Sequence, residues 1–330
     1  MRILTASHVR QALPMRDAIA AVREGAMELS RGTALVPQRV SVPVEAHEAV
    51  ALYMPAFLRA NSWLGVKAVS VYPHNPDRGL PVITAAVLLQ DAASGRPLGL
   101  LEGAALTALR TGAIGGLAAD LLARRDAKVI ALFGAGVQGR SQLEAACTVR
   151  PPDEVRVMDL KPGRATVFVQ EIVGAPFLRG ARLRPVDRSE EAADGADLII
   201  TSTTSPRPVF DGARVKAGAH VTAIGAFTPE AREVDSTLVQ RARVFVDGRQ
   251  ACLAEAGDLL IPMKEGRITE AHIIGEIGEV AAGAVPGRTA ADEITLFKSV
   301  GNAAFDVSVG TAVLRAAERQ RLGEVVDLEA

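Results

Sequence analysis

Three glycines at fixed spacing follow a short apolar run near the middle of the chain. The run 129–133 predicts a buried strand, and Gly134, Gly136 and Gly139 come directly after it, where a helical period begins. In such a turn the first glycine permits a tight bend, the second lets the backbone approach a pyrophosphate, and the third lets the helix lie close to the strand. The N-terminus of the helix then presents free N–H groups to the phosphates. The pattern therefore predicts a dinucleotide-binding turn.

A carboxylate stands where such a turn needs one. The short apolar run 155–158 ends at Asp159, 20 residues after Gly139. An acidic side chain there accepts hydrogen bonds from the adenosine ribose hydroxyls and repels a 2′-phosphate, which favours NADH. Lys161 and Arg164 follow closely and could serve a phosphate instead, so the use of NADPH stays open.

Three cations before the glycine-rich turn stand in apolar surroundings. Arg39 follows Pro37 and Gln38 at the start of a strand pattern, Lys67 interrupts the apolar run 63–71, and Arg110 interrupts the run 104–112. A charge in such a place is costly unless it has a partner or a ligand, or unless its tip reaches water. Arg binds a carboxylate through a planar fork and Lys binds it as a point charge. Together they favour a site for a small carboxylate.

The cations fall in a segment that differs from the rest of the chain. A helical pattern begins at Ser7 and ends at Gly32, a glycine at the position where a C-terminal cap is expected. Four strand patterns follow without helices between them, which predicts an antiparallel sheet. These strands are 40–44, 49–54, 64–72 and 82–90, and they precede a helical stretch from Leu101 to Leu122.

From Lys128 onward, strand and helix patterns alternate, which is typical of a parallel doubly wound sheet. The predicted elements are strands at 129–133, 155–158, 182–185, 196–201, 220–225 and 243–247, with a helix near 164–173. The loops after Thr201 and Gly225 should lie at the carboxyl ends of their strands, where ligands bind in such sheets. The pattern of residues 291–319 predicts a largely helical segment, and a charged tail follows it. Glu230, Arg232 and Glu233 are interpreted as a solvated start of a helix.

Composition narrows the class of protein. At 330 residues the chain exceeds what one hydrophobic core usually organises, so two domains are expected. The net charge of −1 gives no basic stripe for nucleic acid and no anchor for a membrane, so the expected partner is a small molecule. The longest apolar stretch, near 81–89, is too short to span a bilayer. Without a signal-peptide pattern, and with two cysteines that form no motif, a reduced cytoplasmic protein is expected.

Several motifs, in this order, resemble those of the ornithine cyclodeaminase/μ-crystallin family. They are Pro37-x-Arg39, Gly65-Val-Lys67, Leu88-Leu-Gln-Asp91 with Ser94-Gly95, Leu109-Arg110-Thr111, Gly134-x-Gly136-x-Gln138-Gly139, and Ser299-Val-Gly301 with Asp306. The resemblance implies an α/β fold in which a Rossmann domain, residues 113–305, is inserted in an α+β substrate-binding and dimerisation domain. The latter would consist of residues 1–112 plus 306–330 and would form a homodimer through its mainly antiparallel sheet.

The resemblance also implies roles for single residues. It assigns the carboxylate of the substrate, and with it catalysis, to Arg39, Lys67 and Arg110. Further positions beside the substrate would be Met54, Thr84, Phe227, Thr228 and Gly301. The cofactor-binding positions would be Thr111, Gly134, Gly136, Val137, Gln138, Gly139, Asp159, Lys161, Thr201, Ser202, Thr203, Ile224, Gly225, Ser299 and Val300, with no metal ligands.

One position departs from the pattern of the cyclodeaminases. Those members have an aspartate before the loop proline that handles protons on the substrate nitrogen, whereas this chain has Phe227 before Thr228 and Pro229. A phenyl ring can neither accept nor donate that proton. It suits a cyclic imine, which needs a flat apolar wall. Phe227 could instead point into the core, with Thr228 facing the ligand.

The sequence therefore predicts an enzyme that uses NADH or NADPH to reduce a cyclic imino acid. The form of the loop resembles that of reductases that convert Δ1-pyrroline-2-carboxylate to L-proline in hydroxyproline degradation, with Δ1-piperideine-2-carboxylate, the precursor of L-pipecolate, as a related substrate. The alternatives are an alanine or other amino-acid dehydrogenase, an ornithine cyclodeaminase, and a non-catalytic ligand-binding protein of the μ-crystallin kind.

Overall fold

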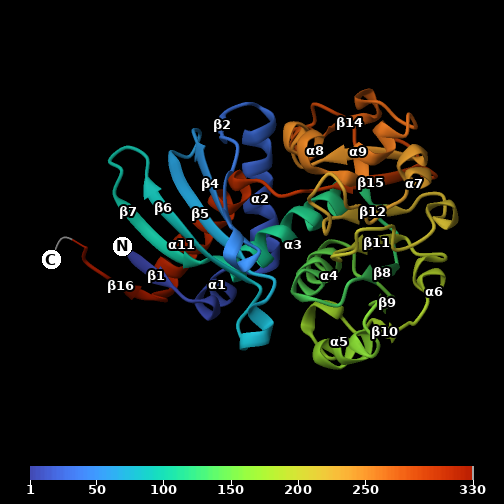
Figure 1. Cartoon of the computed structure of the whole chain (residues 1–330), viewed down its shortest axis with the longest axis horizontal. Helices are drawn as coiled ribbons and strands as arrows, with labels where there is room; N and C mark the ends of the chain where they lie inside the picture. Colours follow the sequence, from blue (N-terminus) through green and yellow to red (C-terminus); the bar gives the residue numbers. More distant parts are fainter. Residues whose placement is uncertain (329–330) are drawn as a thin grey trace. The chain divides into compact units, whose positions relative to one another are not determined.

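The computed structural model describes residues 1–328, which form two compact units (Figure 1). Unit 1 comprises Met1–Arg110 together with the segment that starts at Asn302, and unit 2 comprises Thr111–Gly301. The boundaries fall after residues 110 and 301, rather than after 112 and 305 as the sequence suggested. Unit 1 is therefore discontinuous in sequence, with unit 2 inserted between its two parts.

The N-terminal helical pattern is divided in two. Helix α1 spans Ala6–Ala12 and helix α2 spans Met15–Ser30, so the single helix expected from Ser7 to Gly32 is wrong. Pro14 is the cause, because a proline disfavours helical backbone at the residue before it, and Leu13 is extended with φ −131° and ψ 111°. The chain leaves α2 at Gly32, whose φ of +70° suits glycine at that end.

Sheet A of unit 1 contains the four expected strands and confirms their mainly antiparallel arrangement. Its path is β16-β1-β7-β6-β5-β4-β2, with β3 also paired to β4 and with β1 parallel to β7. The strands are β1 Arg2–Leu4, β2 Ala34–Leu35, β3 Val40–Val44, β4 Ala49–Leu58, β5 Trp63–Val71, β6 Ile83–Asp91, β7 Pro97–Glu102 and β16 Glu324–Val325. Short helices η1 Glu45–His47 and η2 Asn75–Arg78 lie between strands.

One face of sheet A is covered by helix α11, Ala303–Gln320, which also packs on α2. Side chains alternate between the faces of a strand, so every second residue of β4 and β5 points toward this helix. Met54, Ala56 and Leu58 of β4 are buried on this face. Gly65 lies there too, and a Cβ at that position would approach Val307 of α11 to 3.0 Å. The helix therefore lies very close to β5, the strand that carries Lys67.

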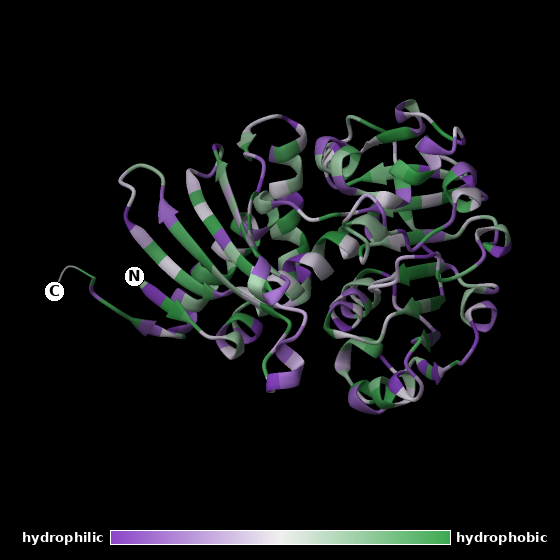
Figure 2. Ribbon diagram, viewed as in Figure 1, coloured by the Kyte–Doolittle hydropathy of each residue, from purple (hydrophilic) through white to green (hydrophobic). Residues whose placement is uncertain are grey.

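Sheet B of unit 2 is parallel throughout, in the order β10-β9-β8-β11-β12-β15-β13-β14. This confirms the predicted Rossmann-type doubly wound sheet. The strands are β8 Val129–Phe133, β9 Glu154–Met158, β10 Arg182–Pro185, β11 Leu198–Thr201, β12 His220–Ala223, β13 Ala242–Val246, β14 Ile273–Glu276 and β15 Ile294–Lys298. Figure 2 shows hydrophobic residues concentrated in these strands, whereas the strands of sheet A are more mixed.

Short helices connect the strands of sheet B. They are α4 Val137–Val149, α5 Arg164–Ile172, η3 Pro176–Leu178, α6 Ser189–Ala193, η4 Gly212–Arg214, α7 Ser236–Arg241, α8 Arg249–Glu255, α9 Gly257–Lys264, η5 Glu270–His272 and α10 Ile277–Ala281. The expectation that residues 291–319 are largely helical is wrong in its first part, because strand β15 precedes α11.

Helix α3, Gly103–Leu122, is a longer apolar segment than the one near residues 81–89. By length and composition it could cross a membrane, but most of it is buried inside the protein, as in the core helix of a globular fold. It begins beside Glu102, whose carboxylate accepts the N–H groups of Ala104 and Ala105 at 3.0 and 2.8 Å. The helix carries Arg110 at the end of unit 1.

Candidate functional site

The glycine-rich turn in unit 2 has the geometry that a dinucleotide requires. Gly134 has a φ of +99°, and a Cβ there would lie 2.6 Å from the carbonyl oxygen of Ser202. A Cβ on Gly139 would collide with the carbonyl oxygen of Gly134, whereas around Gly136 there is open space. Helix α4 starts directly after Gly136 without a side-chain cap, so its first N–H groups are free to bind a pyrophosphate.

Asp159 lies beside this turn, at the end of β9. Its two carboxylate oxygens accept the N–H groups of Ala135 at 2.8 Å and Lys161 at 2.9 Å. Arg164 donates through Nε to the carbonyl oxygen of Ala135 at 2.8 Å, and its Nη1 pairs with Glu171 at 3.0 Å. The guanidinium of Arg164 is therefore engaged within the unit, and Lys161 is left as an exposed cation near Asp159.

The loops after the neighbouring strands hold the other predicted cofactor residues. Ser202 donates to the carbonyl oxygen of Gly134 at 3.2 Å, which joins the loop after β11 to the glycine-rich turn. Thr111 accepts a hydrogen bond from Gln142 of α4 at 2.5 Å. Val137 is exposed, whereas the Oε1 atom of Gln138 is buried without a hydrogen-bond partner.

Two buried carboxylates organise loops at this edge of sheet B. Asp247, after β13, accepts hydrogen bonds from Ser299 Oγ at 2.6 Å, Val300 N at 3.1 Å and Gly301 N at 2.8 Å. Glu233 accepts the N–H groups of Thr203 and Gly225, each at 2.6 Å, and thereby joins the loops after β11 and β12. Thr201 is the last residue of β11, and Ile224 is the first residue after β12. Sheet B thus brings the predicted cofactor residues together within unit 2.

Unit 1 contains a buried cluster of opposite charges. Lys67 Nζ lies 2.7 Å from Asp306 Oδ2, and Arg110 Nε lies 2.9 Å from Asp306 Oδ1. The three side chains are almost completely buried. They come from β5, α3 and α11, so the tertiary fold of unit 1 joins residues that are far apart in sequence. With both cations protonated and the carboxylate ionised, the cluster carries an excess positive charge.

The surroundings change the ionisation of this cluster. Burial lowers the pKa of Lys67 to about 8, assisted by the positive charges of Arg110 and Arg39 and opposed by the attraction of Asp306. Burial alone would raise the pKa of Asp306, but Arg110 and Lys67 outweigh it and hold that pKa below its usual value. Asp306 is therefore a carboxylate at neutral pH, and Lys67 remains mainly an ammonium group.

The remaining substrate positions predicted in unit 1 do not all lie with this cluster. Arg39 is half-buried and close enough to influence the charge of Lys67. Met54 is buried and stands opposite Lys67 in the pairing of β4 with β5. Thr84 pairs with Ser70, three residues beyond Lys67, so alternation places Thr84 on the other face of sheet A, where it is exposed. The structure therefore groups Arg39 and Met54 with Lys67, but does not group Thr84 with them.

The loop after β12 exposes its aromatic side chain. Phe227 is 51% exposed and Thr228 is also exposed, so Phe227 does not point into the core of unit 2. The preceding residue, Ala226, is buried. An aromatic ring is thus presented at the carboxyl edge of sheet B.

Besides Asp197, unit 2 has four buried charged residues that were not predicted as site residues: Glu233, Asp247, Asp258 and Lys298. The interpretation of Glu233 as part of a solvated helix start is wrong, because this side chain is fully buried and the helix begins only at Ser236. Burial raises the pKa of Glu233, opposed by Lys298, and although burial alone would lower the pKa of Lys298, Asp258 and Glu233 raise it. Lys298 could have been found from sequence, since it ends an apolar run as Lys67 interrupts one.

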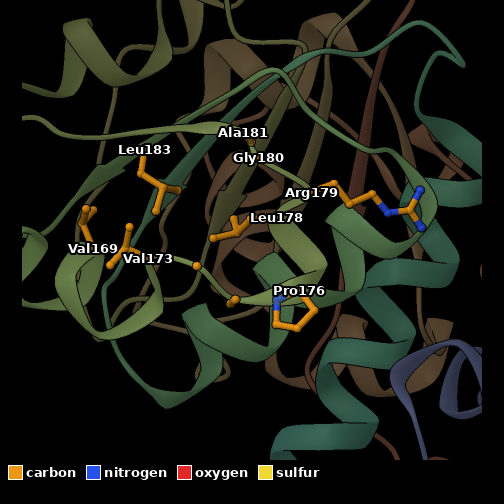
Figure 3. Close-up of a pocket in the computed structure, with 10 residues that line it drawn as sticks. Val169, Val173, Pro176, Leu178, Arg179, Gly180, Ala181 and Leu183 are labelled. Atoms are coloured by element: carbon orange, nitrogen blue, oxygen red, sulfur yellow. The ribbon is translucent and has the colours of Figure 1, made fainter.

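A separate hollow in unit 2 contains none of the predicted site residues (Figure 3). It lies between α5, η3 and the edge strand β10, and its lining includes Val169, Leu178 and Leu183. Arg179 is at its rim and extends away from it. Apart from Arg179, the residues that line this hollow are apolar.

Comparison with known proteins places the chain among oxidoreductases. The model of the ornithine cyclodeaminase/mu-crystallin family matches residues 1–321. A Δ1-pyrroline-2-carboxylate reductase of Bacillus cereus is 34% identical, over 99% of this chain and 100% of the relative.

Two solved structures are similar over the whole chain. The Δ1-pyrroline-2-carboxylate reductase of Thermococcus litoralis, in complex with NADH and L-proline, is 40% identical with a TM-score of 0.94, over 99% of this chain and 100% of that one. An archaeal alanine dehydrogenase dimer with bound NAD is 33% identical with a TM-score of 0.91, over 99% of each chain. The order of the sequence motifs, the fold and these comparisons agree, and the chain belongs to the ornithine cyclodeaminase/mu-crystallin family.

Proposed function

We propose that this chain is an NAD(P)H-dependent oxidoreductase that reduces the C=N bond of a cyclic imino acid, converting Δ1-pyrroline-2-carboxylate to L-proline. Δ1-Piperideine-2-carboxylate, which would give L-pipecolate, is a related substrate. The observation that carries the proposal is the buried cluster of Lys67 and Arg110 around a single carboxylate, Asp306. A buried excess of positive charge is costly unless an anion neutralises it, and a substrate carboxylate would do so.

The cluster would also promote the chemistry. Asp306 engages Nε of Arg110, which leaves the outer nitrogens of the guanidinium as donors to a ligand. A carboxylate held by Arg110 and Lys67 fixes the imine carbon in one place, and the positive charges withdraw electron density from the adjacent C=N bond. The reduced nicotinamide cofactor supplies the hydride when it is bound. The residues of the glycine-rich turn and Asp159 fit such a cofactor, as their geometry in unit 2 indicates.

Phe227 distinguishes this proposal from cyclodeamination. The exposed phenyl ring cannot exchange protons with a substrate amine, whereas it can form an apolar wall for a ring that arrives already closed. The alanine dehydrogenase that resembles this chain makes amino-acid dehydrogenation the second candidate.

The experiment that tests the proposal follows the absorbance of NADH and of NADPH with purified protein and Δ1-pyrroline-2-carboxylate. Parallel reactions contain ornithine with NAD, and pyruvate with ammonium and NADH. Oxidation of the reduced cofactor that is fastest with the cyclic imine supports the proposal. Faster turnover of pyruvate with ammonium would favour the dehydrogenase, formation of proline from ornithine would favour the cyclodeaminase, and nucleotide binding without turnover would indicate a ligand-binding protein.

We further propose a preference for NADH over NADPH. Asp159 places a negative charge beside the glycine-rich turn, and Arg164 is paired with Glu171 rather than free for a phosphate. We expect Asp159→Ser to shift the ratio of kcat/KM for NADH to that for NADPH by about tenfold to a hundredfold toward NADPH, because a repulsion between like charges is removed. Initial rates with both cofactors measure the ratio, which corrects for any general loss of binding. An unchanged ratio would show that Asp159 does not set the preference.

The titration of Lys67 should appear in the dependence of activity on pH. Its ammonium form is present below about pH 8 and is lost as the pH rises through that value. Because the ammonium form binds the substrate carboxylate, we expect kcat/KM for the imine to fall about tenfold per pH unit above this point. Lys67→Arg should remove this decrease, since guanidinium stays protonated. A decrease that persists unchanged in Lys67→Arg would assign the titration to the substrate or to another residue.

We also propose that the protein is a homodimer in the cytoplasm that acts in hydroxyproline degradation. The face of sheet A opposite α11 exposes the apolar side chains of Val40, Val42 and Tyr53, which suits association with a second copy. The similar alanine dehydrogenase is a dimer.

A further inference from the structure

Glu233 is a fully buried carboxylate that connects the ends of two parallel strands. Its Oε1 atom accepts hydrogen bonds from the backbone N–H of Thr203 at 2.6 Å and the hydroxyl of Thr203 at 2.8 Å. Its Oε2 atom accepts the N–H groups of Gly225 at 2.6 Å and Ala226 at 3.3 Å, and the hydroxyl of Thr201 at 2.9 Å. One oxygen therefore holds the loop after β11, while the other mainly holds the loop after β12.

Lys298 holds the second of these loops from its other side. Its Nζ atom donates to the carbonyl oxygen of Ala226 at 2.5 Å and lies 2.7 Å from Asp258 Oδ2. Asp258 Oδ1 in turn accepts the N–H groups of Glu233 at 2.7 Å and Val234 at 3.0 Å. The residues Gly225 and Ala226 are thus fixed by Glu233 at their N–H groups and by Lys298 at a carbonyl oxygen. We call Glu233, Asp258 and Lys298 the loop clamp.

The loop clamp lies at the carboxyl ends of the strands of sheet B, in one half of the expected dinucleotide site. In a doubly wound sheet the dinucleotide lies across the carboxyl ends of the strands, with one nucleotide on each half. Asp159, after β9, marks the adenosine half, so the loops after β11 and β12 belong to the nicotinamide half. The loop clamp holds the backbone of this half, whereas the glycine-rich turn has its own anchors in Asp159 and Arg164, besides its contact with Ser202.

We propose that Glu233 is a positioning residue that fixes the nicotinamide-side loops of unit 2 for hydride transfer without touching the cofactor. The inference rests on the proposed function, since it assumes that a nicotinamide cofactor binds at this edge of sheet B. It assigns a role to a charged group that the carboxylate-binding cluster of unit 1 does not use. The loop clamp also determines where the chain emerges at Phe227, directly after the fixed Ala226.

Glutamine is the informative substitution at this position. In Glu233→Gln, one of the two oxygens becomes an NH₂ group that can only donate. If NH₂ replaces Oε1 it faces the N–H of Thr203, and if it replaces Oε2 it faces the N–H of Gly225. In either orientation a donor faces a backbone donor, so one of the two loops loses its acceptor while the shape of the side chain is kept.

Two ligands separate positioning from general stability. NADH contacts both halves of the cofactor site, whereas ADP-ribose has the same adenosine and pyrophosphate but lacks nicotinamide. We expect Glu233→Gln to raise the dissociation constant for NADH about tenfold, to leave that for ADP-ribose within about twofold, and to lower kcat with the imine at saturating NADH by about tenfold or more. Calorimetric titration of both ligands and steady-state rates on the full-length protein measure these changes.

Asp197→Asn provides the matched control. Asp197 is also buried and accepts two backbone N–H groups, of Lys128 and Val129 at 2.9 Å each, but these lie at the amino end of β8. This variant should leave the ratio of the two dissociation constants unchanged. Equal weakening of NADH and ADP-ribose by Glu233→Gln, or no weakening of either, would overturn the inference.

A milder variant keeps the test decisive if Glu233→Gln fails to fold. Thr201→Val removes one hydroxyl donor to Oε2 and nearly preserves the shape of a buried side chain. It should shift NADH binding in the same direction by about twofold to fivefold without affecting ADP-ribose, and an equal effect on both ligands would contradict the inference. Because the binding experiments contain no imine, they remain valid even if the wild-type protein reduces another substrate.

Discussion

Lys67→Met should lower kcat/KM for the cyclic imine by about a thousandfold, equivalent to about 4 kcal/mol of transition-state stabilisation. The ammonium group that this variant lacks is one of two buried cations at Asp306, and it is the one whose charge depends on pH near neutrality. Met is unbranched and apolar, so it can fill the space of the lysine stem next to Met54. Steady-state kinetics with the imine, at saturating NADH, measure the loss.

The control for this variant is Lys128→Met. Lys128 is half-exposed and pairs with Asp153 at the surface of unit 2, 3.4 Å away, so its removal should leave kcat/KM nearly unchanged. The dissociation constant for NADH should be the same in Lys67→Met as in the wild-type protein, because Lys67 belongs to unit 1 and not to the glycine-rich turn. A decrease in kcat/KM of less than about tenfold would remove Lys67 from the carboxylate site.

Asp306→Asn should destabilise unit 1 by about 3 to 5 kcal/mol, because it leaves two buried cations without their counter-ion. Asparagine has nearly the same shape as aspartate, so the loss does not come from a cavity. Trp63 is the single tryptophan of the chain and begins β5, four residues before Lys67. Its fluorescence during urea denaturation therefore reports the unfolding of unit 1 separately from that of unit 2.

A double variant separates charge from packing in this measurement. In Lys67→Met combined with Asp306→Asn, only Arg110 remains charged, so the double variant should be more stable than Asp306→Asn alone. The exposed Asp126, which pairs with Arg124 at 3.0 Å, supplies the comparison, because Asp126→Asn should have a far smaller effect. If Asp306→Asn unfolds at the same urea concentration as the wild-type protein, the cluster is not held together by charge.

The elements that could be predicted are those whose sequence pattern lies within the element itself. The glycine-rich turn, Asp159 and the strands of unit 2 up to β13 have regular spacing and apolar runs, and they formed as expected. Strand β15 was missed because it lies in the middle of a buried parallel sheet, where both faces are apolar, and because it joins directly to the alanine-rich start of α11. In contrast, the break between α1 and α2 at Pro14 follows from a local rule and could have been predicted from the sequence.

The site was less predictable where tertiary contacts decide. Lys67 and Arg110 could be singled out because a charge in an apolar run needs a partner, but nothing local indicated that both would share Asp306. Thr84 depends on the register of β5 with β6, which sets its face of the sheet and is invisible in a sequence pattern. Glu233 follows Pro229 among polar residues and resembles a surface residue, and only its five donors, at the ends of β11 and β12, reveal its role.

The separation of 239 residues between Lys67 and Asp306 bears on the synthesis of the protein. A ribosome releases Lys67 and Arg110 long before it makes their counter-ion, and α11, which covers sheet A, emerges only after the whole of unit 2. All strands of unit 2 have been made once the ribosome has added Lys298. Unit 2 can therefore fold before the first part of unit 1 has the helix that covers its sheet. During that interval the two cations must stay hydrated, because burying them unpaired is too costly. Completion of the carboxylate site therefore waits until α11 has been made, and a chain cut short before residue 306 would retain the sheet of unit 2 but not this site.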